Sequence, residues 1–296
     1  MMSTVHTRRS FLRSAAALMP AAAFGRLNAS ARQPIPLGVQ LYTVRKQAEQ
    51  DLPGVLERIR RIGYTQVETY GGIYTFSAVA LRHMIEDAGL TAPSAHFGYD
   101  EFPTRFNFAR ELGVSWMVCS VIAPSLWGSA EGFATAAKQF NAWAQRAKDL
   151  GMRVAFHNHD YEFRPFPAGQ SGPSQAARTG YEVLLDETDP ALVFFEIDCY
   201  WAAQAGHDPV ELMRRLGPRV KMLHLKDRKP GFPPSFAMNE TSAHFVPVGK
   251  GSLDWKSILA EGGQLGVEHY FVEQDQTAGP PIEALRESYR YLRGIT

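Results

Sequence analysis

The sequence has 296 residues, of which 45% are hydrophobic and 21% are charged, a composition typical of a folded globular protein. This composition excludes disordered, collagen-like and coiled-coil chains. The 31 basic and 30 acidic side chains give a formal charge of +1, so the chain lacks the basic excess of nucleic-acid-binding proteins. Two cysteines, Cys119 and Cys199, lie far apart in apolar runs, which indicates neither a disulfide framework nor a thiolate metal site.

The first 31 residues contain four arginines and no acidic residue, and they resemble a bacterial twin-arginine export signal. Arg8 and Arg9 precede Phe11 and a weakly apolar stretch, and residues 29–31 (ASA) offer a small-x-small cleavage pattern. We therefore predict a signal peptide at 1–31 and one catalytic domain at 32–296. The expected location is periplasmic or secreted, reached by twin-arginine export of the folded protein.

The chain after residue 31 carries 27 basic and 30 acidic side chains, a formal charge of −3, which further disfavours nucleic acid as a partner. No later segment approaches the ~20 consecutive apolar residues of a membrane span, so no membrane contact is expected after cleavage of the signal.

Short β-branched or aromatic runs alternate with helical patterns along the rest of the chain. Several helical patterns end in a glycine just before such a run, which is typical of the left-handed residue that follows a helix. These glycines are Gly63, Gly89, Gly113, Gly151, Gly217 and Gly266. The predicted strands are 37–42, 66–70, 92–97, 116–120, 153–159, 193–199, 220–226 and 268–274.

Between the strands the apolar period becomes helical, for example at Phe133, Phe140 and Trp143 in one long segment. Eight strand and helix units predict a single (β/α)₈ TIM barrel, with parallel strands covered by helices. A doubly wound open sheet is the alternative, but no glycine-rich phosphate turn follows the first strand.

Every predicted strand has a polar side chain near its carboxyl end, although buried parallel strands should be almost entirely apolar. Strict alternation points these side chains into the barrel mouth, where the active sites of this fold are built. Buried carboxylates beside imidazoles, with no thiolate, favour one divalent ion such as Mn²⁺, Mg²⁺, Co²⁺ or Zn²⁺. The inward set is Gln40, Glu68, His96, Ser120, His157, His159, Asp198, His224, Lys226 and Glu273.

Five runs carry a family resemblance: residues 157–163 (HNHDYEF), 197–198 (ID), 223–227 (LHLKD), 248–255 (VGKGSLDW) and 272–275 (VEQD). In this order and spacing they resemble the sugar phosphate isomerase/epimerase family with a xylose-isomerase-like barrel. The resemblance extends from about residue 36 to residue 292.

The resemblance implies one divalent metal ion held by side chains from strands five to eight. Asp198, His224 and Glu273 match the ligands on strands six, seven and eight. The strand-five ligand in many relatives is a glutamate, whose place is taken here by His157. We expect Glu162 to supply this ligand, with His157 or His159 as the alternative.

The resemblance also implies catalysis by proton abstraction next to a carbonyl, through an enediolate. Glu273 and Glu162 are the expected proton carriers, with His159 near them. Lys226 is expected to polarise a substrate oxygen, or else to pair with an acid of the mouth. The expected substrate-binding residues are Gln40, Glu68, His96, His157, Trp127 and Trp201.

The predicted function is a metal-dependent isomerase or epimerase acting on an unphosphorylated sugar or keto-sugar. The alternative is a 3-keto-glycoside lyase or hydratase that uses the same first step. A metal-dependent endonuclease and a non-catalytic sugar-binding barrel are weaker alternatives. The expected partner is a small sugar or keto-glycoside, and the sequence leaves a homo-oligomer open.

Overall fold

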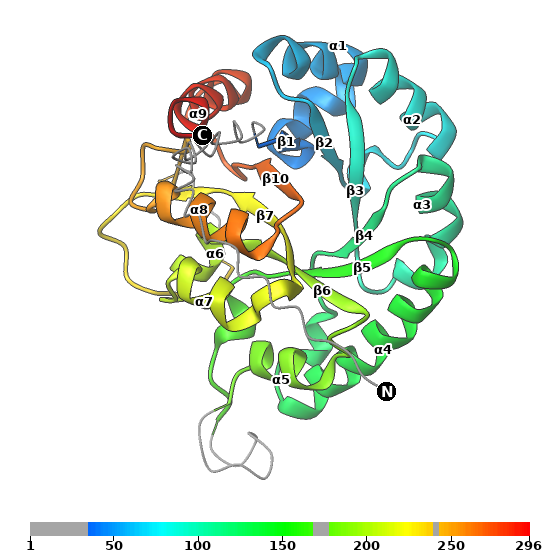
Figure 1. Cartoon of the computed structure of the whole chain (residues 1–296), viewed down its shortest axis with the longest axis vertical. Helices are drawn as coiled ribbons and strands as arrows, with labels where there is room; N and C mark the ends of the chain where they lie inside the picture. The colour runs from blue at the N-terminus through cyan, green and yellow to red at the C-terminus, as the bar shows by residue number, and fades with distance from the viewer. Residues whose placement is uncertain (1–34, 168–177, 239–242) are drawn as a thin grey trace, which may run out of the picture. The chain divides into compact units, whose positions relative to one another are not determined.

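A computed structural model describes residues 35–167, 178–238 and 243–296. Within these residues eight parallel strands form a closed barrel in the order β1-β10-β7-β6-β5-β4-β3-β2, which confirms the predicted fold (Figure 1). Each predicted strand is present, and most of the observed strands end one or two residues before the predicted end. The barrel strands are β1 Leu37–Gln40, β2 Gln66–Thr69, β3 Thr91–Phe97, β4 Trp116–Cys119, β5 Arg153–His157, β6 Val193–Asp198, β7 Val220–Leu225 and β10 His269–Val272.

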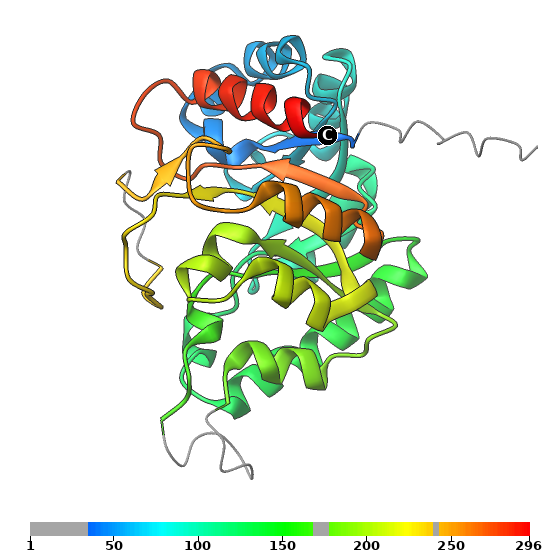
Figure 2. The same cartoon turned by 60° about the vertical axis from the view of Figure 1, so that its left-hand side comes forward.

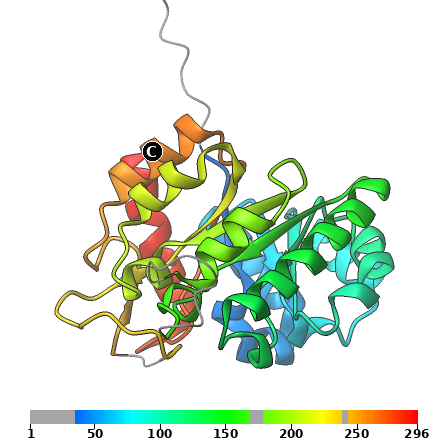
Figure 3. The same ribbon diagram turned by 90° about the horizontal axis from the view of Figure 1, so that it is seen from below.

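Helices lie outside the ring of strands (Figures 1 and 3). In α4 the side chains of Phe133, Phe140 and Trp143 are buried, as the helical period of its apolar residues predicts. Ser129 caps this helix by accepting the backbone N–H of Gly132 at 3.2 Å. The helices are α1 Arg45–Ile62, α2 Ala78–Asp87, α3 Phe106–Leu112, α4 Ala130–Asp149, α5 Gly180–Glu187, α6 Cys199–Gln204, α7 Pro209–Leu216, α8 Trp255–Leu265 and α9 Pro281–Ile295.

The glycines predicted to end helices all have positive φ angles. Gly113 ends α3 with φ +87° and Gly266 ends α8 with φ +74°, both in the left-handed region that an L side chain rarely adopts. The helix ends were therefore readable from sequence, because the backbone there requires glycine.

The connection from β7 to α8 is tied down by Asp227, which is 1% exposed. Its Oδ2 accepts the backbone N–H groups of Gly249 at 2.9 Å and Gly251 at 3.0 Å, and the indole N–H of Trp255 at 2.8 Å. Its Oδ1 accepts the N–H of Arg228 at 2.8 Å. A Cβ on Gly251 would meet this carboxylate and the backbone, so the close approach requires glycine.

This connection also forms a small antiparallel pair, β8 Asp227–Arg228 with β9 Phe245–Val246. Figure 2 shows the pair at the left, where the barrel strands end. Asp227 thus anchors a long segment beside the carboxyl end of β7, one residue after Lys226.

The predicted signal peptide, residues 1–31, lies outside the described residues, so twin-arginine export stays a prediction. Among the residues that are described, no helix is long and apolar enough to cross a membrane. Cys119 and Cys199 are buried free thiols.

Candidate functional site

A cavity of about 490 Å³ opens at the carboxyl ends of the barrel strands. Several residues predicted to point inward line it together, although they come from different strands and strand ends. They are Gln40, His96, Ser120, His157, His159, Lys226 and Glu273. Alternation along the strands therefore located the wall of the cavity correctly.

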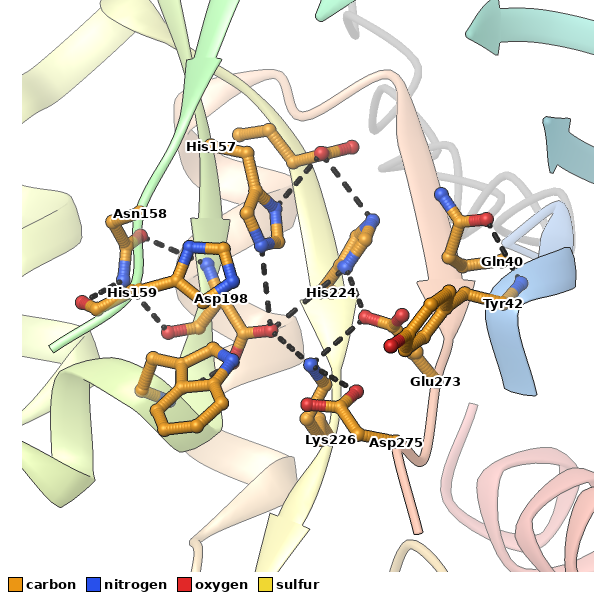
Figure 4. Close-up of polar contacts among 12 residues, drawn as sticks. Gln40, Tyr42, His157, Asn158, His159, Asp198, His224, Lys226, Glu273 and Asp275 are labelled. Atoms are coloured by element: carbon orange, nitrogen blue, oxygen red, sulfur yellow. Dashed lines mark hydrogen bonds and ion pairs between the residues drawn. The ribbon is translucent and has the colours of Figure 1, made fainter. Parts of the chain in front are cut away.

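Asp198, His224 and Glu273 form a compact group beside this cavity, with donor atoms that all lie within 4.8 Å of one another. Nδ1 of His224 lies 2.8 Å from Oε2 of Glu273 and 3.8 Å from Oδ2 of Asp198 (Figure 4). Nε2 of His157 faces the same Asp198 oxygen at 3.9 Å. Two imidazole nitrogens and two carboxylate oxygens thus face one small volume.

Asp198 uses its two oxygens differently. Oδ1 accepts the backbone N–H of Trp201 at 2.9 Å and so caps α6, which begins directly after β6. Oδ2 is buried and already has a cationic partner, because Nζ of Lys226 lies 3.0 Å from it. The same oxygen faces Nε2 of His157 and Nδ1 of His224.

Lys226 places its ammonium group among three carboxylates (Figure 4). Nζ lies 3.0 Å from Asp198 Oδ2, 2.9 Å from Glu273 Oε2 and 2.7 Å from Asp275 Oδ1. Burial lowers the pKa of Lys226, but the three acids outweigh burial and raise the pKa well above its ordinary value. Lys226 is therefore a fixed cation and a hydrogen-bond donor rather than a base.

Glu273 follows β10 directly and carries an ionised carboxylate. Burial raises its pKa, but Lys226 and His224 outweigh burial and hold the pKa well below its ordinary range. His159 is neutral at pH 7, because burial and the nearby ammonium of Lys226 lower its pKa to about 3. The cavity therefore holds an ionised carboxylate and a neutral imidazole, and both are able to accept a proton.

Two buried glutamates lie behind the histidines. Glu196 Oε2 lies 3.1 Å from Nδ1 of His157, and Glu68 Oε2 lies 2.6 Å from Nε2 of His224. His96 contacts both acids, at 2.7 Å from Glu196 Oε2 and 3.0 Å from Glu68 Oε2. These two acids raise the pKa of His96 to about 9, although burial acts in the opposite direction.

Glu196 was missed in the sequence analysis, although a signal for it existed. It stands two residues before Asp198 on β6, so both side chains point to the same face of the strand. The predicted inward set takes Asp198 alone from this strand, and Glu196 lies one layer deeper. An acid inside the buried run VFFEID was the available signal.

Glu162, predicted as a metal ligand and proton carrier, lies elsewhere. After β5 ends at His157 the chain enters a short 3₁₀ helix, Tyr161–Phe163. There the fully buried carboxylate of Glu162 accepts the backbone N–H of His159 at 3.0 and 3.1 Å. Burial raises the pKa of Glu162 to about 8. Neither the described lining of the cavity nor the groups of metal-binding geometry among the described residues include this glutamate.

Glu68, Trp127 and Trp201 were predicted to bind substrate, but the described lining of the cavity includes none of them. Glu68 is fully buried, and its carboxylate accepts the amide of Gln40 at 2.8 Å as well as contacting His224.

The two tryptophans are held by packing instead. The ring of Trp127 stacks on Tyr161 with centroids 3.8 Å apart, and its N–H donates to the carbonyl of Ile122 at 2.8 Å. Trp201 is fully buried in α6, with Nζ of Lys226 5.5 Å from its ring centroid.

The donor set around Asp198 fits a divalent metal ion. Histidine nitrogens and carboxylate oxygens are ordinary ligands for Zn²⁺, Mn²⁺ and Co²⁺, and the donor atoms of Asp198, His224 and Glu273 lie within 4.8 Å of one another. A second group with metal-binding geometry consists of His96, His157, Glu196 and His224. In this deeper group the ring nitrogens that face Glu196 contact its carboxylate directly.

Comparisons with known proteins agree with this architecture. A family model described as xylose isomerase-like TIM barrel matches residues 56–295. Inosose dehydratase of Clostridium botulinum (strain Alaska E43 / Type E3) is 24% identical over 257 residues, which cover 75% of this chain and 83% of that protein.

Among solved structures, a sugar phosphate isomerase/epimerase from Parabacteroides distasonis ATCC 8503 has a TM-score of 0.71 and 27% identity, covering 89% of this chain and 95% of that chain. The IolI protein with a zinc atom has a TM-score of 0.65 and 14% identity, and the match covers 87% of this chain and 98% of that chain. The IolI likeness shows the fold alone.

Proposed function

Because the chain belongs to the xylose isomerase-like TIM barrel family, we propose that it is a metal-dependent enzyme that removes the proton next to the carbonyl of a keto-sugar or keto-cyclitol. We further propose that elimination follows, so that the enzyme acts as a dehydratase or lyase. The proposal rests on one arrangement: ionised Glu273 and cationic Lys226 lie 2.9 Å apart at the cavity, whereas Glu162 lies outside its described lining.

The residues suited to hold the ion are His157, Asp198, His224 and Glu273. When bound, a divalent ion supplies a Lewis acid that stabilises negative charge on the substrate oxygen. Two nitrogen and two oxygen donors favour Zn²⁺, Co²⁺ or Mn²⁺ over Mg²⁺, which prefers oxygen ligands alone. The zinc atom in the IolI neighbour is consistent with this donor preference.

In the proposed reaction, Glu273 accepts the proton from the carbon next to the carbonyl. A carbon–carbon double bond forms as the bond from the adjacent carbon to its oxygen breaks. Lys226, a cation in contact with Glu273, stabilises the departing oxygen. This oxygen takes up the proton that Glu273 has removed and leaves as water or as the alcohol of a glycoside, which returns Glu273 to its ionised form. The name of the inosose dehydratase relatives supports this class of reaction.

Epimerisation or isomerisation is the second candidate, and His159 is the observation that favours it. Epimerisation needs proton carriers on both faces of the reacting carbon. Glu162 does not reach the cavity, but neutral His159 lines it and has a buried Nδ1 without a hydrogen-bond partner among the described residues. Glu273 and His159 would then exchange protons with the substrate from two sides.

The proposed substrate is a small sugar or keto-glycoside rather than nucleic acid, in keeping with a charge of −3 for residues 32–296. We also propose that the protein is exported, on the evidence of the arginine pair in residues 1–31. An exported enzyme would meet unphosphorylated substrates outside the cytoplasm.

A keto-sugar panel in deuterated water tests the proposal. Protein loaded with Zn²⁺, Mn²⁺ or Co²⁺ is incubated with inosose and with 3-keto-glycosides, and NMR follows the products. We expect deuterium exchange next to the carbonyl together with release of water or of the aglycone. An epimer labelled with deuterium would support the second candidate. Turnover without exchange, in wild type and in Glu273→Gln alike, would reject proton abstraction.

A further inference from the structure

We propose that Glu196 and Glu68 are positioning residues, which orient the rings of His157 and His224 so that one nitrogen of each faces Asp198. This inference rests on the metal site proposed above. Neither acid belongs to the described lining of the cavity, and both are fully buried. In each ring the nitrogen that contacts an acid determines which nitrogen is left to face Asp198.

His157 is held through its Nδ1. Glu196 Oε2 lies 3.1 Å from this atom, while Nε2 on the opposite side of the ring faces Asp198 Oδ2 at 3.9 Å. An imidazole is flat and rigid, so fixing Nδ1–H on an acceptor also fixes the direction of Nε2. Nε2 is then the unprotonated nitrogen, the form that a metal ion requires.

His224 is held through the other nitrogen. Its Nε2 lies 2.6 Å from Glu68 Oε2, while Nδ1 faces Glu273 Oε2 at 2.8 Å and Asp198 Oδ2 at 3.8 Å. The two histidines therefore present opposite ring atoms to the same volume. Glu68 lies behind His224, and Glu196 lies behind both rings, 3.1 Å from Nδ1 of His157 and 3.3 Å from Nε2 of His224.

The strand register explains why β6 supplies both the acid behind His157 and the acid in front of it. In the pairing of β5 with β6, His157 lies beside Glu196, and in the pairing of β6 with β7, Asp198 lies beside His224. Glu196 and Asp198 are two residues apart and share a face, so Glu196 lies one layer below Asp198. The acid behind His157 and the acid in front of it thus come from the same strand.

Glu68 is held firmly enough to act as a fixed acceptor. Gln40 donates its amide to Oε2 at 2.8 Å, and Ser94 donates its hydroxyl to Oε1 at 2.5 Å. These two donors belong to β1 and β3, the neighbours of β2 in the barrel. Glu68 therefore cannot swing toward the cavity without losing both hydrogen bonds.

The competing interpretation makes Glu196 a ligand of a second, deeper ion, since His96, His157, Glu196 and His224 also have metal-binding geometry. The two interpretations predict different stoichiometries. Positioning predicts one ion per chain in wild type and in the Glu196 variants, with weaker binding in the variants. A deeper site predicts two ions in wild type and the loss of one of them.

The experiment measures metal content and affinity with Zn²⁺ alone, by competition with a chromogenic chelator. Glu196→Gln keeps the side-chain volume, and Glu196→Ala removes the acceptor entirely. We expect Zn²⁺ affinity to fall about 10-fold to 100-fold in both, with the larger loss in the alanine variant, and the same range for Glu68→Gln. Glu261→Gln is the matched control, because Glu261 is a buried acid that pairs with Arg214 at 2.9 Å. The Zn²⁺ affinity of this variant should equal that of wild type.

NMR of the metal-free protein gives a second readout that does not depend on the proposed function. Two-bond ¹H–¹⁵N spectra of wild type should show the His157 proton on Nδ1, and Glu196→Gln should redistribute it toward Nε2. The inference would be overturned if, in Glu196→Gln, the His157 proton stayed on Nδ1 and the Zn²⁺ affinity equalled that of the Glu261→Gln control. It would also be overturned if wild type bound two ions and the Glu196 variants bound one. If wild type binds no ion but the proton moves, the positioning holds and the proposed function fails.

Discussion

The carboxylate of Asp227 offers a quantitative test of how the β7 to α8 connection is held. Asp227→Asn keeps the size of the side chain and removes one acceptor oxygen. With the amide nitrogen at the place of Oδ2, the N–H groups of Gly249, Gly251 and Trp255 face a donor, and three hydrogen bonds are lost. In the flipped orientation the N–H groups of Arg228 and Leu253 lose their acceptor instead.

Hydrogen bonds to a charged group contribute roughly 1.5–3 kcal/mol each. Taking the lower value for two or three lost bonds, we expect Asp227→Asn to reduce the free energy of unfolding by roughly 3–5 kcal/mol. This is a large share of the ~5–15 kcal/mol that stabilises a typical domain. Burial strengthens the expectation, because the side chain is 1% exposed and water cannot replace the lost partners.

Urea unfolding followed by tryptophan fluorescence measures the effect, and Asp254→Asn serves as the control on the same segment. Asp254 is exposed and caps α8 by accepting the N–H of Ser257 at 3.2 Å, a role that asparagine fills equally well. The control should stay within about 0.5 kcal/mol of wild type. A loss below about 1 kcal/mol for Asp227→Asn would refute the view that this carboxylate holds the connection.

Three further predictions concern the site and the export signal. His157→Gln should weaken Zn²⁺ binding more than Glu162→Gln, measured by metal content after dialysis, and the reverse order would return the strand-five ligand to Glu162. Glu273→Gln should lose on the order of 10² to 10⁴ in rate, with deuterium exchange lost in parallel, because the amide cannot accept a proton. Replacing Arg8 and Arg9 by lysine should leave the protein in the cytoplasm, and fractionation showing unchanged export would remove the twin-arginine interpretation.

The barrel was predictable because its signals are local. Buried parallel strands need nearly continuous apolar runs, and the residue after a helix needs a left-handed backbone, so strands and glycines such as Gly113 and Gly266 mark the chain in order. Alternation also placed Glu273 and His157 correctly, since both lie at or directly beyond a strand end.

Glu162 and Trp201 lie outside the described lining of the cavity, in segments where strand phase no longer applies. Glu162 follows the end of β5 in a 3₁₀ helix, whose direction cannot be extrapolated from the strand before it. Trp201 belongs to α6, which begins at once after Asp198 and turns the indole into the core. Glu196 follows from the same rule that predicts Asp198, because it lies two residues earlier on the same face of β6.

Because His157 pairs with Glu196, the residue type tolerated at one of these positions depends on the residue type at the other. If glutamate replaced His157 while Glu196 stayed, two buried carboxylates would lie side by side in neighbouring strands, at a cost of several kcal/mol. In homologous barrels with an acid at the position of His157, we therefore expect no acid at the position of Glu196. We therefore expect a change of side-chain type at this position of β5 to be accompanied by a change at the neighbouring position of β6.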